Sequence, residues 1–473
     1  MNKQLFINGK WIDASKVVPL KSPYNGEIIA EIPEASLKEV DQAIEAAYQA
    51  RMTMAKMPAY QRAKILENLC ELLEKRSEEA ARIIAKEAAK PLTTAKGEVA
   101  RTIQTYKFAA EEAKRIHGET LPLDAAPGGE SRIAYTVRES LGVIGAITPF
   151  NFPMNLVAHK VGPAIASGNT VVLKPALQTP LSSFFLAELL QEAGLPAGAL
   201  NVVTGRGSVV GQRIVTDDRV KMITFTGSPA VGMAIRNKAG LKRVTLELGS
   251  NAALIIDKGV NLEKLVSRCV TGAFAYQGQV CISLQRIYVH EEMYDNFVEK
   301  FVEATEKLKI GDPLDAETDV SALISPDDVQ RALSWIEEAK QNGAKIATGG
   351  IADRNILHPT VILQADPSLK VSCQEVFAPI VLINKVKSMK EAIELVNDSR
   401  YGLQAGIYTD NVHTALEAAE LLHVGGVMIN DIPTFRVDHM PYGGVKESGL
   451  GREGVKYAVE EMTELKLVVF NRN

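Results

Sequence analysis

The feature that most constrains the fold is a regular alternation of short apolar segments and helix-like segments over residues 143–246. The strand-like runs are residues 143–147, 170–174, 200–204, 222–225 and 244–246, and the helix-like runs between them are residues 154–166, 180–192, 209–215 and 230–239. Short apolar strands that alternate with helices predict a parallel, doubly wound sheet of the α/β class. Ligands of such sheets bind beyond the carboxyl ends of the strands.

The chain on either side of this segment predicts more than one unit. A second α/β stretch extends from residue 252 to about residue 444, with candidate strands at 286–289, 345–347, 360–363, 380–383, 406–408 and 426–429. Residues 5–11 are typical of a hairpin with Asn8-Gly9 at its turn, and residues 36–113 are typical of amphipathic helices. At about 150 residues per domain, the length of 473 residues predicts about three domains.

Two segments fit neither stretch. Residues 121–140 combine prolines and glycines with an extended run, which indicates a hairpin arm. The tail, residues 465–470, is an apolar strand without a neighbour in sequence. An unpaired apolar strand promotes aggregation unless it pairs elsewhere, so we expect the arm and the tail to make contacts between subunits.

Composition and charge exclude several functions. The net charge is -4, from 53 basic and 57 acidic residues, and no basic run resembles a nucleic-acid-binding arm. No apolar stretch approaches the 18 residues of a membrane span, and the N-terminus lacks the apolar core of a signal peptide. The four cysteines are too few and scattered for a disulfide framework, and the histidines have no metal-ligand spacing. We therefore expect a cytoplasmic protein without a metal.

The segment Thr226-Gly227-Ser228-Pro229 follows a predicted strand and opens a predicted helix. Serine followed by proline is typical of a helix N-cap and first turn, and the free N–H groups of a helix N-terminus bind anions. A phosphate cradle is one interpretation and an ordinary strand-to-helix turn is the other. A second glycine loop, at Gly205, Gly207 and Gly211, departs from the dinucleotide-binding spacing and is weak evidence by itself.

Three polar residues occupy positions suited to chemistry. Glycine and glutamine precede Cys281 and indicate a loop, although a free cysteine is more often a small core residue. Glu247 lies between two leucines at a strand end, where it needs either an ion-pair partner or a catalytic task. Asn151 follows another strand in a proline-flanked turn, where its amide could stabilise an oxyanion.

Together these segments resemble the aldehyde dehydrogenase superfamily, over nearly the whole chain. The motifs that carry the resemblance are Pro149-Phe-Asn-Phe-Pro153, Phe225-Thr-Gly-Ser228, Leu246-Glu-Leu-Gly249, Gly278-Gln-Val-Cys281, Glu375-Val-Phe-Ala-Pro379, and Pro441-Tyr-Gly-Gly444 followed by Lys446-Glu-Ser-Gly449. The resemblance implies a Rossmann-like NAD(P)-binding domain formed by residues 1–120 and 141–246. It also implies an α/β catalytic domain, residues 247–445, and a small β oligomerisation arm, residues 121–140 and 446–473, in a homodimer or homotetramer.

The resemblance also implies roles for single residues. Cys281 would attack the aldehyde, Asn151 would hold the oxyanion, and Glu247 would activate the water that hydrolyses a thioester. Lys174 and Glu375 match contacts to the two riboses of the cofactor, Phe377 lies beside the nicotinamide, and Gly227 and Ser228 match the pyrophosphate turn. The complete set of implied cofactor-binding residues is Thr148, Pro149, Lys174, Leu177, Gly207, Gly211, Phe225, Gly227, Ser228, Glu375 and Phe377.

One departure from the family pattern concerns the cofactor. Members that prefer NAD usually carry glutamate at the position of Leu177, where the carboxylate binds the ribose 2′-hydroxyl and repels a 2′-phosphate. Leu177 does neither, so we expect the chain to accept NAD or NADP, with a lean toward NADP. Ala378 replaces a usual glycine, and Gln374 stands where an acidic residue is common.

Within the superfamily the sequence is similar to the lactaldehyde and non-phosphorylating glyceraldehyde-3-phosphate dehydrogenases. Arg101 and Arg436 match arginines that contact the substrate phosphate in the triose-phosphate enzymes; the alternative is a structural pair of surface cations. Phe152 and Val280 depart from that phosphate site. We therefore expect a small hydroxyaldehyde as substrate. A non-phosphorylating glyceraldehyde-3-phosphate dehydrogenase is the alternative, and Glu247 argues against a CoA-acylating enzyme.

Overall fold

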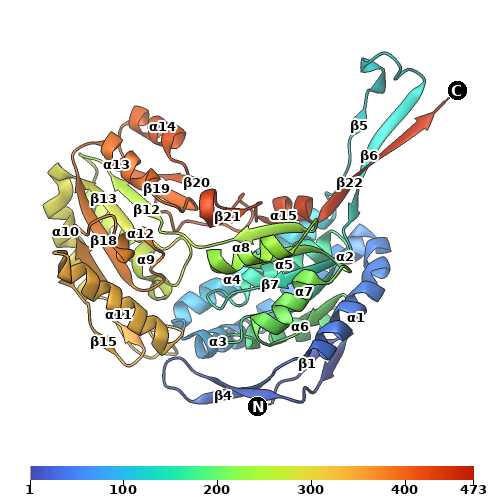
Figure 1. Ribbon diagram of the computed structural model, residues 1–473, viewed down its shortest axis with the longest axis horizontal. Helices are drawn as coiled ribbons and strands as arrows, with labels where there is room; N and C mark the ends of the chain where they lie inside the picture. Colours follow the sequence, from blue (N-terminus) through green and yellow to red (C-terminus); the bar gives the residue numbers. More distant parts are fainter. Residues whose placement is uncertain (1, 473) are drawn as a thin grey trace.

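The alternating segments build an eight-stranded sheet in the computed structural model, which describes residues 2–472 (Figure 1). The predicted strands are parallel neighbours, and short antiparallel strands close both edges. The order is β2 (Lys10–Ile12), β1 (Leu5–Ile7), β9 (Leu200–Val202), β8 (Thr170–Lys174), β7 (Val143–Ile147), β10 (Val220–Thr226), β11 (Arg243–Glu247) and β21 (Gly449–Leu450). The prediction of a parallel, doubly wound sheet is confirmed.

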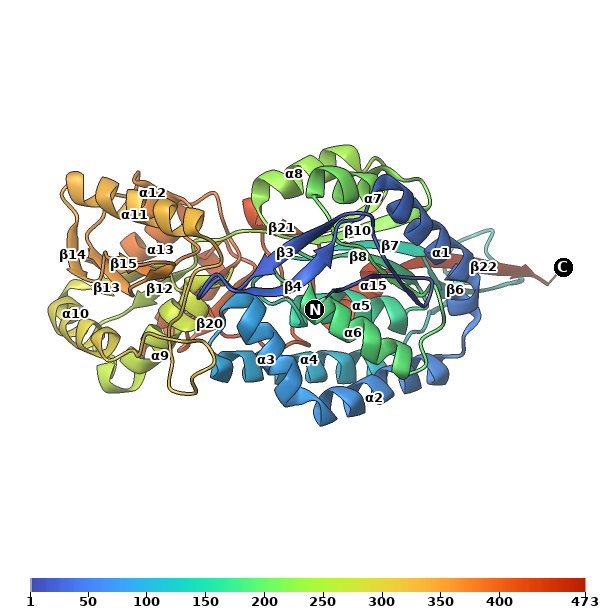
Figure 2. The same ribbon diagram turned by 90° about the horizontal axis from the view of Figure 1, so that it is seen from below.

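Helices cover both faces of this sheet, as Figure 2 shows from below. Buried apolar side chains hold the two layers to the sheet because every residue of β7 and β8 is buried. One layer contains α2 (Ala59–Lys75), α3 (Ser77–Ala88), α4 (Leu92–Ala113), α5 (Asn155–Ala166) and α6 (Leu181–Glu192). The other contains α1 (Leu37–Lys56), α7 (Gln212–Thr216) and α8 (Pro229–Lys238).

The helix predicted at residues 209–215 is only partly correct. Residues Gly207–Gly211 form a single π-helical turn, and α7 follows from Gln212. Single π-helical turns are rare and frequently occur at functional sites.

The second α/β stretch forms a seven-stranded sheet beside the first (Figure 1). The order is β14 (Lys345–Thr348), β17 (Thr360–Leu363), β18 (Ile380–Val386), β13 (Arg286–His290), β12 (Ala253–Ile256), β19 (Gln404–Tyr408) and β20 (Gly426–Ile429). All neighbours are parallel except β14 and β17. The six predicted strands are all present, and β12 was not predicted.

Further helices and two small hairpins complete this half and the N-terminus. The helices are α9 (Leu262–Phe274), α10 (Glu291–Glu306), α11 (Pro326–Gln341), α12 (Lys370–Cys373), α13 (Met389–Asn397) and α14 (Val412–Leu421). The hairpins are β3 (Val17–Lys21) with β4 (Ile28–Pro33), and β15 (Ala352–Asp353) with β16 (Ile356–Leu357).

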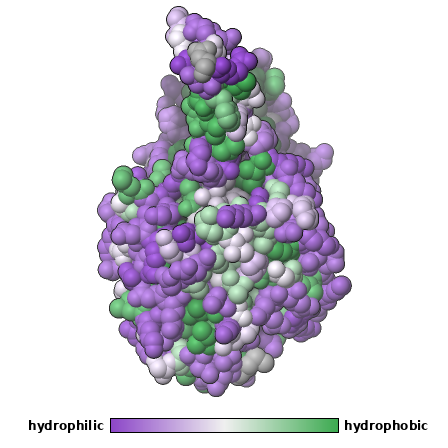
Figure 3. Space-filling view, turned by 90° about the vertical axis from the view of Figure 1, so that its right-hand side faces the viewer, coloured by the Kyte–Doolittle hydropathy of each residue, from purple (hydrophilic) through white to green (hydrophobic). Residues whose placement is uncertain are grey.

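The arm projects from the body as a three-stranded sheet of β5 (Thr120–Leu121), β6 (Arg132–Ser140) and β22 (Thr463–Asn471) (Figure 1). The apolar tail that lacked a partner in sequence pairs antiparallel with β6 along its whole length. Apolar side chains remain exposed on the arm, as Figure 3 shows; they include Ile133, Leu465, Leu467, Val469 and Phe470.

The predicted arm segment 446–473 is divided in the structure. Strand β21 pairs with β11 in the eight-stranded sheet, and α15 (Val455–Glu461) packs against α4 and α5. Only the part from Thr463 onward belongs to the arm. The reason is that α15 is amphipathic and buries Val455, Ala458 and Val459 against the body.

Two glycine substitutions, one in β7 and one in α4, test how tightly these elements are packed. Gly145 lies in β7, where an added Cβ would come within 2.5 Å of Ile214 Cγ2, so Gly145→Ala should destabilise the protein by about 1–3 kcal/mol. Gly97 lies inside α4 with open space around it, so Gly97→Ala should stabilise by about 0.5–1 kcal/mol. The midpoints of urea unfolding measure both changes, and equal midpoints would contradict the packing described for β7.

Candidate active site

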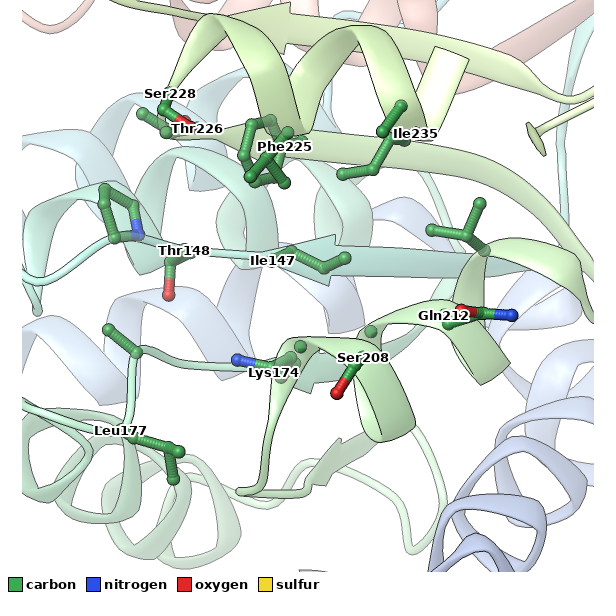
Figure 4. A pocket seen from close by; sticks show the side chains of 18 of the residues that line it. Ile147, Thr148, Lys174, Leu177, Ser208, Gln212, Phe225, Thr226, Ser228 and Ile235 are labelled. Carbon is green, nitrogen blue, oxygen red and sulfur yellow. The ribbon is translucent and has the colours of Figure 1, made fainter. Parts of the chain in front are cut away.

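A pocket of about 800 Å³ opens at the carboxyl ends of β7, β8, β9 and β10 (Figure 4). This is the edge at which a doubly wound sheet binds ligands. The predicted cofactor-binding residues that line it are Thr148, Pro149, Lys174, Leu177, Gly207, Gly211, Phe225, Gly227 and Ser228. Glu375 and Phe377 lie outside this pocket.

Lys174 supplies the positive charge of the pocket. Its side chain is buried, and burial lowers the pKa of the amine to about 8. The Nζ atom donates to the carbonyl of Pro175 at 3.2 Å, and none of the ion pairs within residues 2–472 includes it. Figure 4 shows Leu177 on the loop that follows β8. The amine is therefore available to a ligand oxygen or phosphate.

The turn between β10 and α8 has the geometry of an anion cradle. Ser228 is the N-cap of α8 with extended backbone, its side chain makes no capping hydrogen bond, and Pro229 is the first helical residue. Gly227 is required because an added Cβ would lie 2.5 Å from the Phe225 ring. The N-terminus of α8 therefore faces the pocket with free N–H groups.

A strained turn precedes the candidate nucleophile. In the 3-10 segment η3 (Ala275–Gly278), φ is +48° at Tyr276, +54° at Gln277 and +70° at Gly278. Positive φ costs a non-glycine residue about 1–3 kcal/mol and persists only where surrounding contacts hold it. The Tyr276 hydroxyl donates to the Ala88 carbonyl at 3.1 Å, and the Gln277 amide donates to the carbonyls of Ala89 and Ala322 at 2.9 Å.

Cys281 follows this turn, in a loop as predicted. Its Sγ atom lies 2.9 Å from the Tyr442 hydroxyl oxygen. Burial raises the pKa of the Cys281 thiol to about 11, while the Tyr442 hydroxyl and Arg436 act in the opposite direction. Cys70 and Cys269, by contrast, are buried core residues, as predicted.

Asn151 is tied to the same loop. Its side-chain amide donates to the carbonyl of Gln279 at 2.9 Å, and Lys90 donates to the backbone carbonyl of Asn151 at 2.6 Å. Lys90 is itself buried and paired with Glu98, whose other oxygen accepts from the backbone N–H of Met154 at 2.9 Å. These contacts fix the side-chain amide of Asn151 against Gln279, which lies two residues before Cys281 in the chain.

Glu247 ends β11 and is 3% exposed. Neither carboxylate oxygen has a hydrogen-bond partner among the described residues, so Glu247 is not the salt-bridged structural carboxylate that was its alternative interpretation. Burial and the nearby Glu453 carboxylate raise the pKa of Glu247 well above its usual value. Gly443 leaves room for it, since an added Cβ there would lie 3.0 Å from Glu247 Oε1.

A buried charge network surrounds these residues and was missed by the sequence analysis. Lys160 donates to Glu453 at 2.8 Å and to the Thr226 hydroxyl at 2.7 Å, and His159 Nε2 lies 2.8 Å from Asp438. One signal was present in the sequence, because His159 and Lys160 are polar residues within the otherwise apolar helix α5, in which every residue is buried.

The two candidate substrate arginines belong to this network. Arg101 donates twice to Asp438, at 2.7 and 3.1 Å, and keeps a third of its side chain exposed. Arg436 donates to Glu453 at 3.1 Å and is only 6% exposed, so the interpretation of a surface cation is wrong for Arg436. Its Nε is buried without a partner among the described residues. Phe152 lies beneath Lys90, whose Nζ is 3.8 Å from the ring centre.

Glu375 lies against the segment that follows β11, and Phe377 lies against the loop that follows β7. Glu375 accepts from the backbone N–H of Ser250 at 2.9 Å, and burial raises its pKa to about 7. Gly249 makes this approach possible, because an added Cβ would lie 2.4 Å from Glu375 Oε2. The Phe377 ring packs edge-on against Phe150, with ring centres 5.8 Å apart.

Within residues 2–472, no group of three or more histidine, cysteine, aspartate or glutamate side chains is arranged to hold a metal ion. Within the same range, no helix is both long and apolar enough to cross a membrane.

Comparison with known proteins identifies the class. The family model described as "Aldehyde dehydrogenase family" matches residues 11–468, so the chain belongs to the aldehyde dehydrogenase family and is an oxidoreductase. The resemblance, the fold class and the enzyme class predicted from the sequence are all confirmed.

Three relatives indicate to which branch of the aldehyde dehydrogenase family the chain is similar. The chain is 47% identical to a 3-sulfolactaldehyde dehydrogenase of Priestia aryabhattai, over 99% of this chain and 98% of the relative. It is 42% identical to a lactaldehyde dehydrogenase of Methanococcus aeolicus, over 99% and 100%. A solved structure of the glyceraldehyde-3-phosphate dehydrogenase GapN from Methanocaldococcus jannaschii, complexed with NADP, is 41% identical with a TM-score of 0.93, over 97% and 100%. The predicted branch is therefore confirmed.

Proposed function

We propose that this protein oxidises a small hydroxyaldehyde that carries one anionic group to the carboxylic acid, with NAD or NADP as oxidant. The observation that carries the proposal is the convergence of a thiol, a side-chain amide and an unpaired carboxylate beside the pocket: Cys281, Asn151 and Glu247.

The pocket fits a dinucleotide. The N-terminus of α8 with Gly227 and Ser228 would hold the pyrophosphate, Lys174 the adenosine ribose, and Glu375 with Phe377 the nicotinamide end. When bound, the cofactor supplies the acceptor for the hydride of the oxidation. We propose that the eight-stranded unit is the cofactor-binding domain and that the seven-stranded unit is the catalytic domain.

Cys281 would form a thiohemiacetal by attack of its sulfur on the aldehyde carbon. Charge then develops on the former carbonyl oxygen. The Asn151 amide has one N–H engaged with Gln279 and a second available to this oxygen, together with the backbone N–H of Cys281. Loss of hydride from the thiohemiacetal leaves a thioester on Cys281.

Glu247 would accept a proton from the water that hydrolyses the thioester. A carboxylate that is buried without hydrogen bonds is a stronger base than an exposed one, because its ionised form is poorly solvated. The presence of this base supports hydrolysis over transfer of the acyl group to CoA.

The charges around the site support an anionic substrate. Three cations each have a carboxylate: Lys90 with Glu98, Lys160 with Glu453, and Arg101 with Asp438. Arg436 shares Glu453 with Lys160, and its Nε has no partner among the described residues. Arg436 therefore keeps one N–H for a substrate anion, which favours a singly charged group such as a sulfonate over a doubly charged phosphate.

The arm supports a homodimer or homotetramer. Its exposed apolar side chains on β6 and β22 would be covered by a second copy of the chain. We propose the cytoplasm as its location, since all four cysteines are free.

The substrate assignment predicts an order of kcat/KM: 3-sulfolactaldehyde above glyceraldehyde 3-phosphate and lactaldehyde. Arg436→Met should reduce the preference for 3-sulfolactaldehyde over lactaldehyde by about tenfold or more, because a hydrogen bond to a charged group is worth about 1.5–3 kcal/mol. Arg268→Met, which removes a surface arginine paired with Asp431, is the control and should leave the ratio unchanged. A wild type that favours lactaldehyde would exclude the anionic class.

The roles of Glu247 and Cys281 predict distinct kinetics. Glu247→Gln should show a burst of reduced cofactor followed by slow turnover, since the base acts after the hydride leaves. Stopped-flow absorbance of reduced cofactor measures both phases. Cys281→Ala is the matched variant; it should show neither burst nor turnover while cofactor binding persists. Absence of the burst in Glu247→Gln would require another role for that residue.

Cofactor choice tests the position of Leu177. The wild type should accept both cofactors with a lean toward NADP, because Lys174 attracts a 2′-phosphate and no carboxylate repels it. Leu177→Glu should shift the ratio of kcat/KM toward NAD by about 1–3 kcal/mol. Gln178→Glu, one residue further along the same loop, is the positional control. A wild type specific for NAD and an unchanged ratio in Leu177→Glu would show that residue 177 does not face the ribose.

A further inference from the structure

Tyr442 occupies a position next to the thiol that the proposed mechanism does not use. It is 2% exposed, and its hydroxyl oxygen lies 2.9 Å from Cys281 Sγ. Among the described residues, Cys281 is the sole hydrogen-bond partner of this hydroxyl. The phenol therefore makes its one polar contact with the reacting atom.

Two features hold the ring of Tyr442 in place. Its backbone exchanges hydrogen bonds with Glu453, at 3.0 Å through the N–H and 2.7 Å through the carbonyl. The guanidinium carbon of Arg436 lies 3.6 Å from the ring centre, and the ring packs in one apolar cluster with Tyr276, Val280 and Cys281. A cation over the ring withdraws charge from the phenol and makes its O–H a better donor.

We propose that Tyr442 is a further catalytic residue, which donates its hydroxyl hydrogen to the sulfur of Cys281 and stabilises the thiolate. This inference rests on the proposed role of Cys281 as the nucleophile.

The surroundings of Cys281 explain why such a donor is needed. The thiolate, not the thiol, is the nucleophile, and burial opposes its formation. The carboxylates of Glu247 and Glu375 also disfavour it, whereas Arg436 and the Tyr442 hydroxyl favour it. Of these groups only Tyr442 is hydrogen-bonded to the sulfur.

The opposite direction of this hydrogen bond, with the Cys281 thiol as donor, predicts a different result. If the thiol donates to the phenol oxygen, the hydrogen bond stabilises the neutral form, and its removal lowers the pKa of Cys281 or leaves it unchanged. The direction of the change in thiol reactivity therefore decides between the two.

The experiment is alkylation of Cys281 by iodoacetamide as a function of pH, quantified by mass spectrometry of the Cys281 peptide. Tyr442→Phe should reduce the alkylation rate at neutral pH about tenfold and raise the midpoint of its pH profile by about one unit. Tyr294→Phe, which removes a buried hydroxyl that donates to the Ile383 carbonyl at 3.3 Å in another part of the seven-stranded unit, is the matched control and should leave the profile unchanged. The half-buried Cys373 reports reagent activity in every sample.

A second substitution strengthens the donor instead of removing it. Replacement of Tyr442 by 3-fluorotyrosine, whose phenol is more acidic, should increase the alkylation rate severalfold at the same pH. This variant keeps the aromatic ring and its packing. If Tyr442→Phe does not fold, the fluorinated protein therefore still tests whether the Tyr442 hydroxyl donates to Cys281. An unchanged or faster rate in Tyr442→Phe, or an unchanged rate in the fluorinated protein, overturns the proposal. Alkylation needs neither aldehyde nor cofactor, so a failure of the proposed oxidation would be seen separately.

Discussion

The site depends on the left-handed turn at Tyr276, Gln277 and Gly278. This turn belongs to the seven-stranded half, but two of its anchors, the carbonyls of Ala88 and Ala89, lie at the end of α3 in the other half. The strain of two positive φ values is thus held by contacts that cross from one unit to the other. In the proposed mechanism, the thiol reaches the substrate only while these contacts hold the two units together.

Lys90, which follows Ala89 in the chain, holds the loop that carries Asn151. Its amine bonds to the Asn151 carbonyl and pairs with Glu98, which in turn caps the start of α5. Loss of one partner of a buried ion pair costs about 3–5 kcal/mol, because the other charge is left uncompensated. Three consecutive residues, Ala88 to Lys90, therefore position both the nucleophile loop and the loop that carries the amide.

The sequence predicted the local features well and the long-range ones poorly. Strands of the parallel sheets and the turn at Gly227 follow from apolar runs and turn residues that are adjacent in the chain. Strand β12 was missed although Gly249-Ser250-Asn251 separates it from the Glu247 motif, because an apolar run of four residues does not by itself distinguish a strand from a helix. The pairing of β22 with β6 and the contact of Arg436 with His159 join residues hundreds of positions apart, which no local pattern reveals.

Asp438 lies beside the candidate substrate arginines and also holds several elements of the fold together. It accepts from Arg101, Asn155 and His159, so it holds the loop that carries Arg436 against α4 and α5. Replacement of Arg101 alone would leave a buried carboxylate with one cation fewer, whereas replacement of Arg101 and Asp438 together would remove both charges. Substitution of Arg101 is therefore expected to accompany substitution of Asp438, and related chains that differ at one of the two positions should differ at both.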